Sequence, residues 1–120
     1  MQPETLRATV GGWPGVTEDI KWGADLVFSV GGKMFCVLDT GESGRLSFKV
    51  EDGRFLELTE RPGVIPAPYL ARARWVSAVE ARAFAGAELQ GLLRRSYELV
   101  RAKLPKAEQR RLAAMEVPGN

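Results

Sequence analysis

The residue types that most often perform chemistry in proteins are scarce in this chain. Its 120 residues contain no histidine and a single cysteine, Cys36. Without histidine there is no Ser-His or Cys-His nucleophile pair, no imidazole metal ligand and no ordinary general base near neutral pH. One cysteine cannot complete an ordinary zinc site either. Cys36 lies in the apolar segment 34–38, so we expect a buried, unreactive thiol, no catalytic residue, no metal and no cofactor.

Carboxylates and one hydroxyl are the remaining candidates for acid–base or nucleophilic chemistry. Glu18-Asp19 and Glu51-Asp52 are adjacent pairs, and neighbours on an extended segment point apart, so neither pair is expected to share a proton or a cation. Asp52 precedes a helical pattern and is expected to cap it. Ser96 falls on the apolar face of a later helix. We expect its hydroxyl to bond to the carbonyl four residues earlier, with no base beside it.

The charged residues are distributed unevenly along the chain. Residues 1–60 contain six Lys or Arg and ten Asp or Glu, whereas residues 61–120 contain eleven and five. A basic half suits a phosphate-binding surface, because each neutralised phosphate releases counterions and adds salt-sensitive affinity. A solvated helix face of one sign would give the same bias. The candidate nucleic-acid-binding residues are Lys33, Arg45, Lys49, Arg72, Arg74, Arg94 and Arg101.

Two aromatic residues stand beside this basic set in the sequence. Tyr69 and Trp75 could stack on an unpaired base. Their apolar neighbours and strand spacing favour packing in or beside the core. Phosphate contact by arginine is therefore the leading interpretation, because the planar guanidinium can bind two oxygens at once.

The first half of the sequence predicts a short helix followed by three strands. Pro3 suits a first helical position, and Leu6 and Val10 share one face of a helix over residues 3–10. Gly31-Gly32 supplies a two-residue turn with positive φ between two apolar runs, which predicts a hairpin. The expected strands cover residues 26–30, 34–38 and 46–50.

The second half predicts helices on either side of an extended region. Pro66 and Pro68 lack a backbone N–H, so residues 64–70 are expected to be extended but not to form a central strand. Pro105 belongs in the first turn of a last helix, because inside a continuous helix it would cost ~3 kcal/mol. The other expected elements are a helix over residues 53–60, a strand over 74–79, a helix over 87–103 and the last helix through 115.

This order of elements predicts one α+β domain over residues 1–120, an antiparallel sheet with helices packed on one face. The composition is that of an ordinary globular protein, with 45% hydrophobic and 27% charged residues. No apolar run is long enough for a membrane span, and the first residues lack the pattern of a signal peptide. We therefore expect a cytoplasmic monomer with no membrane contact.

Five short motifs in this order resemble those of the MmcQ/YjbR family of small bacterial proteins, and together they extend over nearly the whole chain. In that family a Pro-Gly-Val-x-Glu turn, a Gly-Lys-x-Phe hairpin and a Ser-Tyr-x-Leu-Val helix recur. The residue before the strand tryptophan is often histidine, and here it is Arg74. The matching segments are residues 13–18, 31–35, 66–70, 74–76 and 96–100, the last followed by Lys103-Leu104.

The resemblance implies an α+β fold related to the CyaY (frataxin) fold and a DNA-binding role through two protruding hairpin wings beside a helix. If the family histidine only contacts phosphate, Arg74 would serve that purpose. We therefore expect a protein that is not an enzyme and that binds DNA weakly and largely without sequence preference. The alternative is an adaptor or chaperone-like module that binds another protein through its sheet or its proline-bearing segment.

Overall fold

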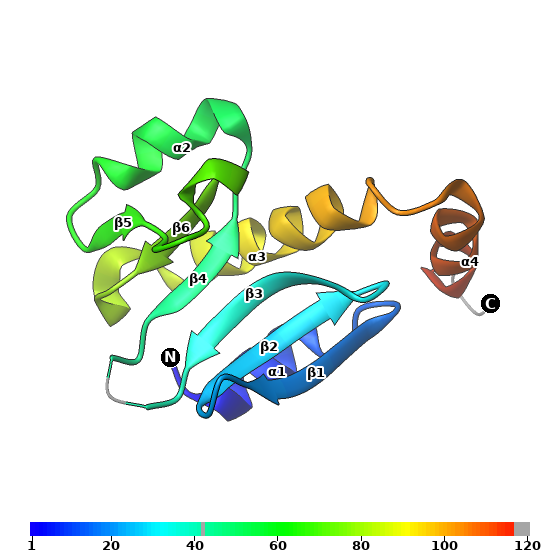
Figure 1. The fold of residues 1–120 in the computed structure, drawn as a ribbon, viewed down its shortest axis with the longest axis horizontal. Helices are drawn as coiled ribbons and strands as arrows, with labels where there is room; N and C mark the ends of the chain where they lie inside the picture. Colours follow the sequence, from blue (N-terminus) through cyan, green and yellow to red (C-terminus); the bar gives the residue numbers. More distant parts are fainter. Residues whose placement is uncertain (42, 117–120) are drawn as a thin grey trace.

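The computed structural model describes residues 1–41 and 43–116, which form a six-stranded antiparallel sheet with helices against it (Figure 1). The strand order across the sheet is β1-β2-β3-β4-β6-β5. The elements are α1 (Pro3–Val10), β1 (Val16–Lys21), β2 (Asp25–Val30), β3 (Lys33–Asp39), β4 (Leu46–Lys49), α2 (Asp52–Thr59), β5 (Val64–Pro66), the 3-10 turn η1 (Ala71–Ala73), β6 (Trp75–Ala78), the 3-10 turn η2 (Ala81–Ala83), α3 (Gly86–Arg101) and α4 (Lys106–Glu116).

The first four strands form a continuous meander, and the predicted part of it is confirmed. Strands β2 and β3 join through Gly31 and Gly32, whose φ angles of 58° and 79° are those of a hairpin turn that glycine favours. Strand β1 was not predicted. It pairs along its whole length with β2, but five of its six residues are exposed, so its sequence shows no apolar alternation.

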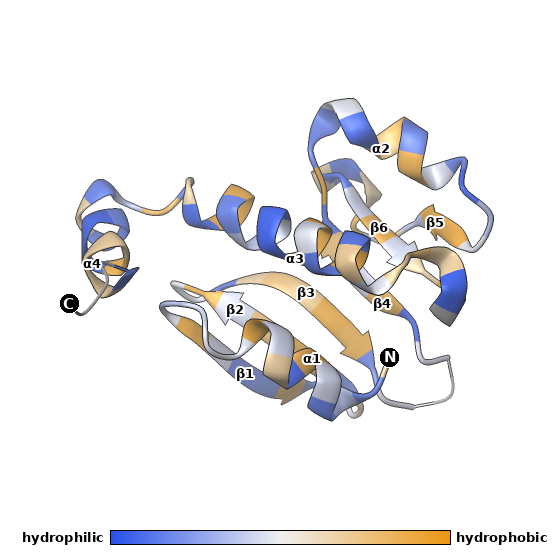
Figure 2. Cartoon of the chain, turned by 180° about the vertical axis from the view of Figure 1, so that it is seen from behind, coloured by the Kyte–Doolittle hydropathy of each residue, from blue (hydrophilic) through white to orange (hydrophobic). Residues whose placement is uncertain are grey.

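The main core lies between the sheet and the helices α1 and α3, as the sequence predicts. Seen from behind, both helices lie in front of the sheet, and β3 is largely hydrophobic (Figure 2). Leu6 and Val10 of α1 are fully buried, as are Phe48 of β4 and Tyr97 of α3. Helix α2 packs beside β5 and β6 and adds Leu58 to the same core.

The opposite face of the sheet carries a second, smaller hydrophobic cluster. Val27, Val37 and Trp75 of the sheet pack there with Ala67, and Met34 and Leu70 lie against them. The chain between β5 and β6 therefore folds over this face. Trp75 is 4% exposed, which confirms that it packs in the interior. The prediction of an extended segment over residues 64–70 is confirmed only in part: β5 is a short edge strand, but residues 68–70 form a turn in which Tyr69 has a positive φ of 66°.

Two predicted details of the helices are wrong. Asp52 is the first residue of α2 and does not cap it: Glu51 occupies the N-cap position, with no side-chain capping bond. Pro105 was predicted to lie in the first turn of the last helix. It directly precedes α4 instead, and its carbonyl accepts the N–H of Gln109 at 3.0 Å. Among the described residues no helix is long and apolar enough to cross a membrane.

Candidate functional site

The residues that could take part in catalysis or bind a metal lie apart from one another. Cys36 is buried in β3, and burial raises the pKa of its thiol, so the thiolate is disfavoured. Glu18 forms a 2.9 Å ion pair with Arg7, and Glu51 pairs with Arg95 at 3.1 Å. Within residues 1–41 and 43–116 no three His, Cys, Asp or Glu side chains gather where they could hold a metal ion.

Ser96 has a different partner from the one predicted. Its hydroxyl donates to the carbonyl of Phe35 at 2.7 Å and accepts the backbone N–H of Lys49 at 3.0 Å. The β3–β4 pairing ends at Cys36 opposite Phe48, so Phe35 and Lys49 are the next residues along the two strands. The hydroxyl thus bridges the strands where their ladder ends, and it fixes the backbone that carries Lys49.

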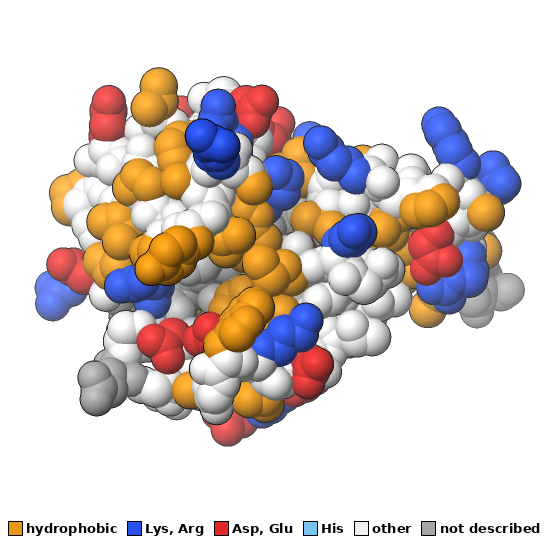
Figure 3. All heavy atoms as spheres, in the orientation of Figure 1, with side chains coloured by type: hydrophobic (Ala, Val, Ile, Leu, Met, Phe, Trp, Pro, Cys, Tyr) orange, Lys and Arg blue, Asp and Glu red, His pale blue; other side chains and the backbone are white. Residues whose placement is uncertain are grey.

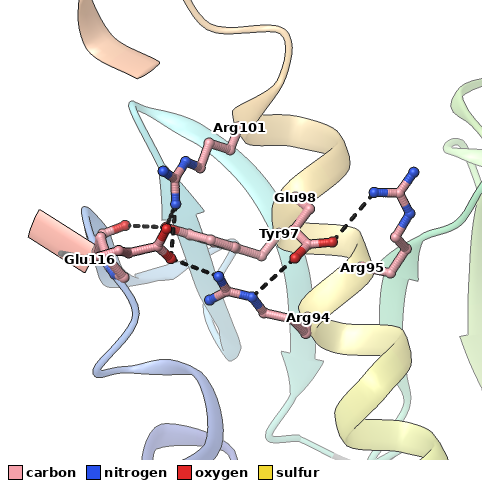
Figure 4. Close-up of polar contacts among 7 residues, drawn as sticks. Arg94, Arg95, Tyr97, Glu98, Arg101 and Glu116 are labelled. Carbon is pink, nitrogen blue, oxygen red and sulfur yellow. Dashed lines mark hydrogen bonds and ion pairs between the residues drawn. The ribbon is translucent and has the colours of Figure 1, made fainter. Parts of the chain in front are cut away.

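Arg94 and Arg101 are held in an ion-pair cluster between α3 and α4 (Figure 4). Arg94 donates to Glu116 at 2.6 Å, and its guanidinium lies 5.2 Å from the ring centroid of Trp13. Arg101 lies 3.1 Å from the same carboxylate and donates to the Tyr97 hydroxyl at 3.1 Å. The structure therefore places these two candidates apart from the other five, in contacts that fasten α4 to α3.

Lys49, Arg74 and Lys103 form a positively charged cluster at the meeting point of β4, η1 and the end of α3. The Lys49 ammonium donates to the carbonyl of Ala73 at 2.6 Å. Burial and then the positive charge of Lys103 lower the pKa of Lys49; Asp52 opposes this shift, and Arg74 adds a smaller lowering effect. Arg74 lies 3.5 Å from Asp52, so this carboxylate offsets only part of the charge. The cluster favours an approaching anion.

Lys33 and Arg72 extend this cluster in two directions. The β2–β3 turn lies against the chain after α3, since a Cβ on Gly31 would come within 2.6 Å of Leu104. The exposed Lys33 follows this turn directly, Lys103 directly precedes Leu104, and the exposed Arg72 is in η1 two residues before Arg74. We call the resulting surface the basic band; its residues are Lys33, Lys49, Arg72, Arg74 and Lys103.

An open groove of about 550 Å³ lies on the sheet face next to the basic band. Its floor is apolar and includes Met34, Val37 and Leu70. Two exposed aromatic side chains, Trp22 and Tyr69, line it. Figure 3 shows hydrophobic side chains around a hollow in the centre of this face, with Lys and Arg side chains above it toward η1 and α3. We call this feature the aromatic groove.

Polar groups line part of the aromatic groove. Arg45 contributes a buried Nε that has no hydrogen-bond partner among the described residues. Asp25 and Asp39 face each other across β2 and β3, and burial together with the charge of Asp39 raises the pKa of Asp25. Asp39 accepts bonds from the Ser43 hydroxyl and from the N–H of Gly41, which lower its own pKa. The groove thus offers the guanidinium of Arg45 as a donor and the two carboxylates as acceptors.

Unusual backbone geometry is concentrated on this one face. In the described part of the chain, the non-glycine residues with positive φ are Trp22, Tyr69 and Arg74, at 51°, 66° and 63°. This conformation costs roughly 1–2 kcal/mol for a residue with a Cβ. Two of the three line the aromatic groove and the third belongs to the basic band, so the strain supports a functional surface.

Four of the five residues of the basic band are among the candidates predicted from the sequence, and Lys103 is not. Trp22 of the aromatic groove was not predicted either. Tyr69, expected to pack, is fully exposed, whereas Trp75 is buried. Gly23, with a φ of 89°, indicates the turn in which Trp22 lies, but nothing in the sequence indicates that this tryptophan is exposed. Lys103 carries no local signal, because its neighbours Lys49 and Arg74 are distant in sequence.

Comparisons with known proteins identify the fold and the family of the chain. The structure is similar to a crystal structure of a Deinococcus radiodurans protein described by the domain name DUF419, with 31% identity and a TM-score of 0.82 over 92% of this chain and 86% of that one. A crystal structure of a Pseudomonas syringae protein has the same fold at 17% identity, with a TM-score of 0.64 over 83% of this chain and 99% of that one. None of the curated proteins matches. A family model described as YjbR matches residues 11–99, from the turn after α1 nearly to the end of α3, and the chain therefore belongs to the YjbR family.

Proposed function

We propose that this YjbR protein binds nucleic acid weakly and largely without sequence preference, through the basic band. The observation that carries the proposal is the position of the Lys49 ammonium, which donates to the carbonyl of Ala73 beside Arg74 and is also affected by the charge of Lys103. Such a cluster gains when phosphates replace water and counterions around it. Arg72 and Lys33 lengthen it along the surface, which suits a linear polyanion.

The same geometry supports contact with the backbone of the nucleic acid without sequence readout. Reading a base pair in a groove requires a helix or ribbon that carries several polar side chains to base edges. The band instead joins residues from a hairpin turn, a strand, a 3-10 turn and a helix end. Phosphate contacts of this kind fix orientation and supply affinity, while sequence information comes from elsewhere.

We propose binding without catalysis. A buried Cys36 with a raised pKa does not supply a nucleophile, and the sequence provides no histidine to activate a hydroxyl. The Ser96 hydroxyl is engaged by two backbone groups. These facts support an interaction role over an enzymatic one.

A salt titration tests the function. Duplex DNA of mixed sequence is titrated by fluorescence anisotropy at about 50 mM and about 200 mM salt. If all five band residues contact phosphate, the dissociation constant rises about 500-fold, and fewer contacts give a proportionally smaller slope. Arg72→Glu and Lys103→Glu should each weaken binding to every duplex sequence by the same factor, because both residues are exposed and read no base.

Arg82→Glu is the matched control, since Arg82 is exposed in η2 and lies outside the band. Its affinity should remain that of the wild type apart from a small effect of net charge. Equal losses in the band and control variants would show that only net charge matters. Absence of binding to duplex and to single strands at about 50 mM salt would refute the proposed function.

A protein partner is the second candidate, and the aromatic groove favours it. One wall of the groove is the proline-bearing segment, with Pro68, Tyr69 and Leu70 beside an apolar floor. Exposed aromatic residues next to a hollow are typical of protein-binding surfaces. This candidate predicts a complex that survives high salt and is lost in Tyr69→Ala, with Arg72→Glu unchanged.

A further inference from the structure

We infer that the aromatic groove holds an unpaired base of a single-stranded nucleic acid whose phosphates lie on the basic band. The inference rests on the proposed function and adds to it the kind of strand that is bound. Duplex DNA keeps its bases stacked and paired, so inserting one into a groove costs unpairing and unstacking energy that a single strand avoids.

The groove and the band are neighbouring parts of one surface. Ser47 lines the groove, and Lys49 lies two residues further along β4, on the same face of the sheet. Leu70 of the floor directly precedes η1, which carries Arg72. A strand whose phosphates follow the band therefore passes along the edge of the groove.

The groove suits a flat, neutral ring. Trp22 is 68% exposed and Tyr69 is fully exposed, although both are large aromatic residues whose burial would be favourable. Each is presented by a backbone with positive φ, at the tip of the β1–β2 hairpin and in the segment before η1. Aromatic side chains presented in this way form the stacking platforms on which proteins bind unpaired bases.

The polar groups of the groove fit the edge of a base better than they fit a phosphate. The guanidinium of Arg45, which lines the groove, can donate to a carbonyl or ring nitrogen. The carboxylate of Asp25 can accept from an amino or imino group, and together with Asp39 it repels phosphate from this part of the groove. Charge complementarity thus places the phosphates on the band and the base in the groove.

The central experiment compares three probes of the same length: a single strand of about 16 nucleotides, the duplex of that sequence, and an abasic strand that keeps only sugars and phosphates. We expect the wild-type protein to bind the single strand more tightly than either of the others. Tyr69→Ala and Trp22→Ala should each weaken single-strand binding about tenfold and leave abasic binding unchanged. Arg72→Glu should weaken all three.

Two variants serve as controls. Leu56→Ala removes an exposed apolar side chain from α2, away from the groove, and should leave all affinities unchanged. Trp22→Phe should keep most of the affinity while abolishing the fluorescence quenching that a stacked base produces in the wild type. Trp75, which is buried, should give no such quenching.

The results distinguish this inference from the proposed function. If Tyr69→Ala and Trp22→Ala bind the single strand as the wild type does, while Arg72→Glu binds it less well, the groove holds no base and the band alone binds. If the abasic strand binds as tightly as the normal one, the groove again holds no base and the inference is wrong. If no probe binds, both the inference and the proposed function fail, and a protein partner becomes the explanation of the groove.

Discussion

The hydroxyl of Ser96 on α3 donates a 2.7 Å hydrogen bond to the carbonyl of Phe35, 61 residues earlier in the chain. Because it also accepts the N–H of Lys49, a single buried side chain ties the long helix to two strands of the sheet. Helix α3 is therefore fixed at the point where β4 leads into the basic band.

Replacing this hydroxyl should destabilise the domain. Ser96→Ala leaves a carbonyl and an N–H without their shared partner in the interior, and each unsatisfied group costs about 1–3 kcal/mol. We expect a loss of about 2–4 kcal/mol in the free energy of unfolding, measured by urea denaturation. Thr9→Ala is the control, since the Thr9 hydroxyl donates only to the carbonyl of Thr5 within α1, in an exposed hydrogen bond. Equal stability of the two variants would contradict the bridging role.

The comparison of sequence and structure shows which features depend on distant contacts. The hairpin at Gly31-Gly32 was predictable, because two adjacent glycines between apolar runs satisfy a local backbone requirement. The role of Ser96 was not, because a hydroxyl in a helix has a local carbonyl available and its actual partners are 47 and 61 residues away. Strand β1 escaped prediction because only its first residue is even half-buried.

Some features of the candidate site could likewise be predicted from the sequence, and others depend on distant contacts. The cations of the band could be proposed from charge alone, but their grouping with Lys103 depends on how the β2–β3 turn meets the end of α3. The exposure of Tyr69 could not be predicted, since an aromatic residue among apolar neighbours usually packs in the core. Its φ of 66° belongs to the turn over residues 68–70.

The two glycines of the β2–β3 turn should respond differently to substitution. Gly32 has a φ of 79° and open space around its Cα, so Gly32→Ala incurs only the backbone strain, about 1 kcal/mol. Gly31→Ala incurs similar strain and also drives a Cβ to within 2.6 Å of Leu104. We expect Gly31→Ala to be the less stable of the two by thermal unfolding, and Gly32→Val to cost about 1–2 kcal/mol. The opposite order would mean that the turn does not rest on Leu104.

The Cys36 thiol should be protected in the folded protein. It has no exposed surface, and burial raises its pKa, so both access and ionisation are suppressed. A thiol reagent such as a maleimide should label it slowly under native conditions and rapidly in denaturant, as followed by mass spectrometry. Rapid labelling of the native protein would point to a reactive cysteine and reopen an enzymatic role.

Helix α4 should be held less firmly at low pH. The hydrogen bond from Arg94, together with Arg101, keeps the pKa of Glu116 below its usual range. A carboxylate whose pKa is lower in the folded than in the unfolded protein stabilises the folded state at pH values above its unfolded-state pKa of about 4.3. This contribution is lost as the pH falls through the folded-state pKa. Amide exchange in residues 106–116 should therefore increase, relative to the core, as the pH is lowered below about 4.

Glu116→Gln supplies the comparison for this effect. The variant lacks the titrating group, so α4 should exchange faster at neutral pH and show less additional loosening in acid. Leu112 remains buried against Gly15 in both proteins and keeps the helix associated. Identical pH dependence in the variant and the wild type would assign the acid effect to another carboxylate.

Arg74 combines a strained backbone with a charge that the proposed function requires. Its φ is 63°, its guanidinium lies 5.5 Å from the ring centroid of Phe55, and Asp52 is its ion-pair partner. Arg74→Ala and Arg74→Gly remove the same side-chain contacts, but only glycine relieves the strain. We therefore expect the glycine variant to be more stable than the alanine variant by about 1 kcal/mol in urea denaturation.

Both Arg74 variants should bind nucleic acid equally weakly, with the salt dependence reduced by about one phosphate contact. Equal stability of the two variants would contradict the strain, and unchanged nucleic-acid affinity in both would remove Arg74 from the basic band.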